Sequence, residues 1–91
     1  MDLTDDRVHL IARALADPRR LQLLRQIGQA RDTLACECLR GCTQVSAATV
    51  SHHMKELETA GLVESTREGK FVSYRLRRDV LEAYLASMAQ I

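Results

Sequence analysis

Three cysteines, Cys36, Cys38 and Cys42, lie within a stretch of seven residues. Thiolates at this density suit a soft, thiophilic ion such as As(III), Sb(III) or Cd(II). They can also be oxidised to a disulfide or a modified thiol, or pack as small apolar side chains. On a regular helix Cys38 and Cys42 share one face, whereas Cys36 points about 200° away from Cys38. The three roles therefore stay open, and the identity of any cofactor is unknown.

Two adjacent histidines, His52 and His53, could also suggest a metal site. Successive residues of a helix point in different directions, and no third ligand converges on this pair. We therefore expect His53 to lie at the boundary of the core with a hydrogen bond to the backbone, and His52 to point outward. The chain also lacks a nucleophile–base pair, a phosphate loop and closely spaced carboxylates, so we predict that it is not an enzyme.

The composition indicates one globular domain over residues 1–91. Hydrophobic residues make up 46% and charged residues 27% of the chain, and the net charge is +1. The stretch 67–78 nevertheless holds five cations against Glu68, which fits either a surface that docks on phosphate or a solvated charged face. No signal peptide and no apolar run long enough to span a membrane is present, and the cysteine count is odd. We expect a cytoplasmic location without a membrane partner.

Apolar spacing and capping residues predict four helices in the first two thirds of the chain. The first covers residues 5–16. Asp17 and Pro18 begin the second, which Gly28 ends. A short third helix covers 34–40, and the fourth covers 47–60 between an N-terminal cap at Ser46 and a C-terminal stop at Gly61.

A hairpin and a last helix follow. Residues 62–67 and 70–76 favour strand, with Glu68-Gly69 as the two-residue connection. Val72, Tyr74 and Leu76 should share one face of the hairpin. The last helix covers 79–90, with Asp79 as its cap. The order α-α-α-α-β-β-α, mostly α with a charged hairpin, is that of a winged helix-turn-helix.

The fourth helix carries a narrow apolar stripe of Val50, Met54 and Leu57, which we expect to face the core. A step of 100° per residue then puts small and polar residues on the outward face. These residues can contact base edges and phosphates of double-stranded DNA, as can two cations beside the hairpin turn. The predicted DNA-binding residues are Ala47, Ala48, Ser51, His52, Lys55, Arg67 and Lys70.

The last helix carries an apolar face that is wide for so small a domain, and the first helix carries a matching apolar stripe. Such faces favour burial against a second copy of the chain. We therefore predict a homodimer whose interface contains Val8, Ile11, Leu15, Leu81, Tyr84, Leu85 and Met88.

Three segments together resemble one family, the ArsR/SmtB repressors: ALADPRRLQLLRQI, VSAATVSHHMKELETAGLV and STREGKFVSYRL. The resemblance runs from about Arg13 to Leu76, and its most specific part is Val50-Ser51-His52-His53 with Ala60-Gly61-Leu62-Val63. It implies a winged-helix homodimer that binds an operator and leaves it when an inducer binds.

Arsenic and cadmium sensors of that family often carry Cys-x-Cys on the third helix, before an Asp-Leu pair. Here Cys36 and Cys38 come one place later, and Cys38 stands where those sensors have the aspartate. The resemblance thus implies a repressor that responds to a soft metal or metalloid ion, with thiol oxidation as a second signal. The alternative is a winged-helix module for protein–protein contact or dimerisation that binds no operator.

Overall fold

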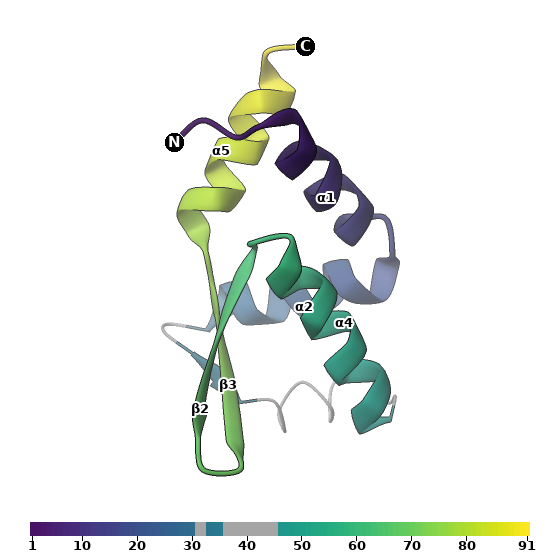
Figure 1. Cartoon of the computed structure of the whole chain (residues 1–91), viewed down its shortest axis with the longest axis vertical. Coiled ribbons are helices and arrows are strands. Elements are labelled where there is room, and N and C mark those ends of the chain that lie inside the picture. Colours follow the sequence, from purple (N-terminus) through teal and green to yellow (C-terminus); the bar gives the residue numbers. More distant parts are fainter. Residues whose placement is uncertain (31–32, 36–45) are drawn as a thin grey trace.

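The computed structural model describes residues 1–30, 33–35 and 46–91, and all statements on the structure concern these ranges. Its helices are α1 (Asp5–Leu15), α2 (Pro18–Gln29), α4 (Ala47–Thr59) and α5 (Arg78–Ala89). Its strands are β1 (Leu34–Ala35), β2 (Val63–Glu68) and β3 (Phe71–Leu76). They form one antiparallel sheet in the order β1-β3-β2. The architecture is a winged helix-turn-helix, with the β2–β3 hairpin as the wing (Figure 1).

Local signals fix most helix ends. Asp17 caps α2 by accepting a hydrogen bond from the Arg19 backbone N–H at 2.8 Å, with Pro18 next in the chain. Ser46 caps α4 in the same way through the Thr49 N–H at 3.2 Å. Gly61 adopts a φ of 85°, which lets the chain leave α4 abruptly. The predictions at Asp17, Ser46 and Gly61 are confirmed.

Two predicted helix ends are wrong. Gly28 does not end α2, which continues to Gln29; a Cβ at Gly28 would lie 3.4 Å from the Leu76 side chain, so the glycine lets α2 approach β3 closely. Asp79 does not cap α5, because the helix begins at Arg78. The Asp79 carboxylate lies in the first turn and accepts hydrogen bonds from Arg77 instead.

The expected helix over 34–40 does not begin at Leu34. Leu34 and Ala35 form β1, which pairs with Tyr74 and Ser73 of β3. Half-buried Leu34 packs against the core, and its backbone extends the sheet by a third strand. Tertiary pairing has overridden local helix propensity here. Residues 36–40 lie outside the described ranges.

The wing turn is displaced by one residue from its predicted place. Glu68 pairs with Phe71, so the two connecting residues are Gly69 and Lys70 rather than Glu68 and Gly69. Gly69 has a φ of 61°, the left-handed conformation that such turns require. Val72, Tyr74 and Leu76 do share the more buried face, as their alternation predicts.

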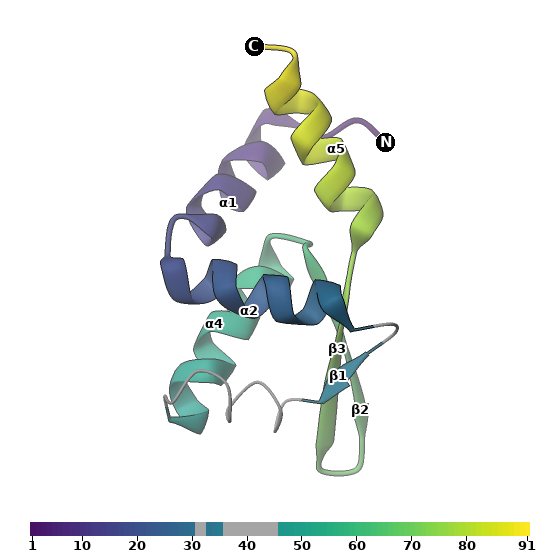
Figure 2. The ribbon, with the colours of Figure 1, turned by 180° about the vertical axis from the view of Figure 1, so that it is seen from behind.

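One aliphatic core joins α1, α2, α4 and the start of β2. Its fully buried large side chains are Ile11, Leu23, Ile27, Val50, Met54, Leu57 and Leu62. Helices α1 and α5 lie at one end of the molecule, while the wing tip and the N-terminus of α4 lie at the other (Figures 1 and 2). The fold thus separates two surfaces, one at each end.

Candidate nucleic-acid interface

The outward face of α4 is set by the burial of its opposite side. Val50, Met54 and Leu57 are at most 1% exposed, so the predicted stripe is confirmed. The other side presents the five residues predicted to read DNA, all exposed: Ala47, Ala48, Ser51, His52 and Lys55. Two methyl groups near the helix start permit close approach to base edges, while hydroxyl, imidazole and ammonium groups supply hydrogen bonds.

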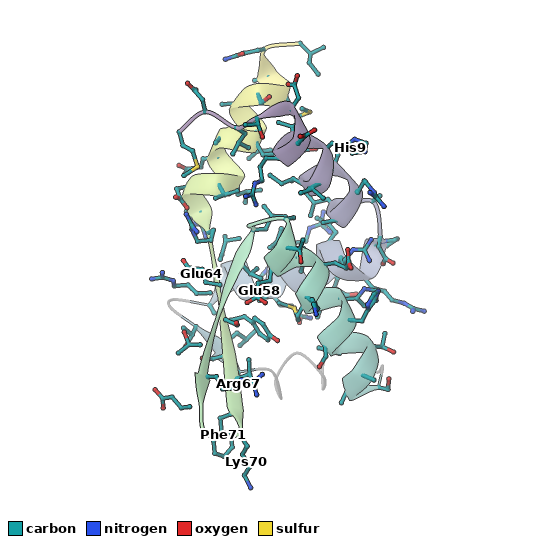
Figure 3. All side chains as sticks on the ribbon, in the orientation of Figure 1. His9, Glu58, Glu64, Arg67, Lys70 and Phe71 are labelled. Atoms are coloured by element: carbon teal, nitrogen blue, oxygen red, sulfur yellow. The ribbon has the colours of Figure 1, made fainter. Side chains whose placement is uncertain are left out.

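The wing tip carries two uncompensated cations. Arg67 and Lys70 are exposed and lie near the turn (Figure 3). Neither has a hydrogen-bond or ion-pair partner within the described ranges. Their charges are therefore available to an anion such as a phosphate.

The other cations of the basic stretch are already engaged. Arg75 binds Glu64 at 2.9 Å, and Arg77 lies 3.4 Å from the same carboxylate. Arg77 also hydrogen-bonds Asp79, which raises the pKa of the guanidinium and lowers the pKa of the carboxyl group. Arg78 donates to the Gly28 carbonyl at 3.2 Å. The stretch 67–78 is thus basic at its tip and largely neutralised at its base, a division that sequence order alone does not indicate.

Arg20 connects three helices, and sequence reasoning missed it. Its Nε donates to the Ala14 carbonyl at 2.6 Å, at the end of α1. Its Nη1 lies 3.4 Å from Nδ1 of His53 on α4, and 3.9 Å from the carboxylate of Asp17 at the start of α2. The guanidinium therefore connects α4 to the junction between α1 and α2.

His53 is 6% exposed and takes part in that connection. Its partner is the Arg20 side chain, not the backbone as predicted. Because a guanidinium only donates, the neutral imidazole with Nδ1 as acceptor is the form that fits. Burial lowers the pKa of His53; the Asp17 carboxylate opposes this shift, while the neighbouring cations reinforce it. The adjacent His52 is exposed, so the two imidazoles point to different surroundings.

The opposite end of the molecule is apolar. Leu85 and Met88 of α5 are 55% and 36% exposed, while Val8, Leu15, Leu81 and Tyr84 are half-buried. A groove of about 410 Å³ runs between α2 and α5, and its lining includes Leu15, Leu24, Leu81 and Leu85. Ile11 must be removed from the predicted dimer surface, because it is fully buried in the protomer's own core.

The cysteine predictions fall on Cys36, Cys38 and Cys42, which lie outside the described residues. Within the ranges the structure describes, no three His, Cys, Asp or Glu side chains gather as metal ligands would. No helix in those ranges has the length and apolar character needed to cross a bilayer.

Comparison with known proteins agrees with this geometry. A helix-turn-helix domain family matches residues 15–66, more than half of the chain. The arsenical resistance operon repressor of Staphylococcus xylosus is 35% identical over 77 residues, which cover 79% of this chain and 67% of that protein. This chain belongs to the ArsR/SmtB family of winged-helix transcriptional regulators.

Two mycobacterial proteins extend the comparison of this ArsR-family chain. The HTH-type transcriptional regulator Rv0324 of Mycobacterium tuberculosis is 37% identical over 71 residues; the match covers 78% of this chain but only 30% of that protein. The solution structure of the homodimeric winged helix-turn-helix domain of Mb0332 from Mycobacterium bovis, a possible ArsR-family regulator, superposes with a TM-score of 0.76. That match has 30% identity and covers 98% of this chain and 87% of the other.

Burial of His53 predicts a pH-dependent stability. Its folded pKa lies below the ordinary 6.5, so the unfolded chain binds more protons as the pH falls below that value. The free energy of unfolding should therefore decrease from about pH 7 to about pH 5. This window lies above 3.8, the value below which the Asp17 and Asp79 carboxyls titrate.

Urea denaturation at a series of pH values and one protein concentration measures the effect. His53→Leu should flatten the pH dependence in this window, whereas His52→Gln, on the exposed neighbour, should leave it intact. Equal slopes in the wild-type protein and His53→Leu would contradict the assignment.

Proposed function

We propose that this regulator represses transcription by binding an operator through α4 and the wing. The observation that carries the proposal is that the N-terminal part of α4 lies at the same end of the molecule as the exposed cations Arg67 and Lys70 (Figures 1 and 3). A helix with small and polar outward residues suits the major groove, and the cations suit phosphates. Near-neutral net charge limits indiscriminate binding, so recognition depends on this local surface.

Replacement of the reading face tests operator binding. A duplex selected by the protein from a random pool serves as the probe. Alanine at Ser51, His52 and Lys55 together should weaken binding to it by about 100-fold, because base contacts are lost, and weaken binding to an unrelated duplex less. The control Gln22→Ala, exposed on α2, should bind like the wild-type protein. Unchanged affinity in the triple variant would favour the protein–protein module instead.

The wing makes a separate contribution in salt. Lys70→Ala should reduce the slope of log Kobs against log salt by about 0.9, because one phosphate contact is lost. Arg75→Ala should change the slope less, because Glu64 already compensates that cation. A slope that does not respond to Lys70→Ala would show that the tip does not touch phosphate.

We infer that the chain acts as a homodimer through α1 and α5. The apolar side chains exposed at that end and the adjoining groove support a second copy as the occupant, and the related Mb0332 domain is homodimeric. After the removal of Ile11, the interface comprises Val8, Leu15, Leu81, Tyr84, Leu85 and Met88.

Sedimentation equilibrium tests the dimer. Leu85→Glu should raise the dimer dissociation constant by tenfold or more, roughly the cost of losing one buried leucine, without unfolding the protomer. Gln90→Glu adds the same charge at the residue that follows α5, about 140° around the helix axis from Leu85, and should leave association unchanged. Dimers of equal strength in both variants would place the interface elsewhere.

We further propose that a soft metal or metalloid ion releases the repressor by binding Cys36, Cys38 and Cys42. Three clustered thiols are a suitable donor set for As(III), Sb(III) or Cd(II), and the Staphylococcus xylosus relative is named for arsenical resistance. Cys42 lies four residues before Ser46, the cap of α4, so a change in the cysteine segment can alter the placement of α4. Thiol oxidation would act through the same segment.

Titration of the protein–duplex complex distinguishes these signals. Arsenite, antimonite or cadmium should release the duplex, and Cys36→Ser, Cys38→Ser or Cys42→Ser should each weaken that response. Zinc should act less strongly, because it is a borderline ion. Release by peroxide alone would assign redox sensing, and release by none of these reagents would contradict both forms of the proposal.

A further inference from the structure

Phe71 is an exposed aromatic residue at the wing tip. In the described ranges, the other exposed large apolar side chains belong to the chain ends or to α1 and α5. Phe71 is 62% exposed, and it lies at the end of the molecule farthest from that apolar surface (Figure 3). Because the protomer does not bury Phe71, its ring is available to a partner that also binds the neighbouring cations.

The hairpin itself does not account for Phe71. The register pairs it with Glu68, on the face that also carries Thr66 and Ser73. Tyr74 and the half-buried Val72 occupy more protected positions, whereas Phe71 is not among the residues that pack against the core. The turn is fixed by Gly69, whose φ is 61°. A polar residue could thus replace Phe71 at little cost to the fold.

The cations near Phe71 suit the phosphates along the edges of a DNA groove. Lys70 precedes it in the chain, and Arg67 pairs with the next residue, Val72, on the other face of the hairpin. Both cations are exposed and uncompensated within the described part of the chain. Their attraction for phosphates on the groove edges would outweigh repulsion from Glu68, which carries a single negative charge. The aromatic ring at the same tip would meet the uncharged sugars and bases.

We propose that Phe71 enters the minor groove and wedges against a flexible pyrimidine–purine step. Apolar side chains that read the minor groove partly unstack such steps, which deform more readily than others. This inference rests on the proposed operator binding. It adds a preference for deformable base-pair steps, which hydrogen bonds from α4 do not supply. The proposed partner of Phe71 is duplex DNA. The feature that Phe71 recognises is the ease with which the base-pair step beneath the wing deforms.

Affinities for paired duplexes test the wedge. The selected duplex is footprinted to locate the wing, and a TpA step there is compared with a stiff A-tract step. Phe71→Ser should weaken binding by about tenfold, as expected for lost burial of an aromatic ring, leave the salt slope unchanged and abolish the preference for TpA. Phe71→Leu should keep most of both. The control Thr66→Ala, on the same face, should behave like the wild-type protein.

A fluorescent reporter gives a second, independent readout. The chain contains no tryptophan, so Phe71→Trp introduces a single indole at the tip. Its quenching by acrylamide should decrease severalfold when the selected duplex is bound.

The outcomes separate this inference from the proposed function. If the triple variant of Ser51, His52 and Lys55 loses the duplex while Phe71→Ser retains full affinity and the TpA preference, only the wedge is overturned. An indole that stays fully quenchable in the complex also overturns it. If the wild-type protein binds no selected duplex, operator binding and the wedge fail together.

Discussion

The architecture depends on the burial of one side of α4. Val50, Met54 and Leu57 pack into a core shared with α1 and α2, and removal of any of them would leave a cavity at the centre of a small domain. Since a helix cannot bury one face without presenting the other, this packing alone determines which residues point outward. The Ser46 cap and the sharp exit at Gly61 fix the ends of that face. The packing of the core therefore determines which face of α4 is exposed.

Charge and apolar area are distributed along the long axis of the domain. At one end the wing projects Arg67 and Lys70, while acidic partners neutralise Arg75 and Arg77 at its base. At the other end, α1 and α5 expose aliphatic side chains. A nearly neutral protein can in this way concentrate positive potential where a nucleic acid would dock. We propose that one end binds DNA and the other a second copy of the chain.

Arg20 provides a physical connection between those ends. It contacts the last turn of α1, the cap of α2 and His53 on α4. A shift of α1 relative to α2 would change the surroundings of the buried His53 imidazole on α4. Arg20 is therefore the side chain through which a displacement of α1 would reach α4.

Regular periodicity made much of this fold predictable. The stripe of α4, the alternation of β3 and the caps at Asp17 and Ser46 all depend on residues close in sequence. The wrong predictions concern residues whose contacts are distant in the sequence. Leu34 became a strand by pairing with Tyr74, which is 40 positions away in sequence. Ile11 was assigned to a dimer surface because an apolar stripe does not reveal which of its members the protomer itself buries.

Side-chain pairing was the least predictable part of the candidate site. Arg20 and His53 are 33 residues apart, and neither carries a local motif that would indicate their contact. The sequence likewise presents residues 67–78 as one basic surface, although Glu64, three residues before Arg67 in β2, neutralises part of it. By contrast, exposure of Ser51, His52 and Lys55 followed directly from helical geometry.

The most direct measurement of the central claim is a backbone amide NMR titration of the protein with a selected DNA duplex. We expect the largest shifts at the start and outward face of α4 and at the wing tip, with small changes along α5. Shifts concentrated on α1 and α5, with Ser51, His52 and Lys55 unaffected, would contradict it.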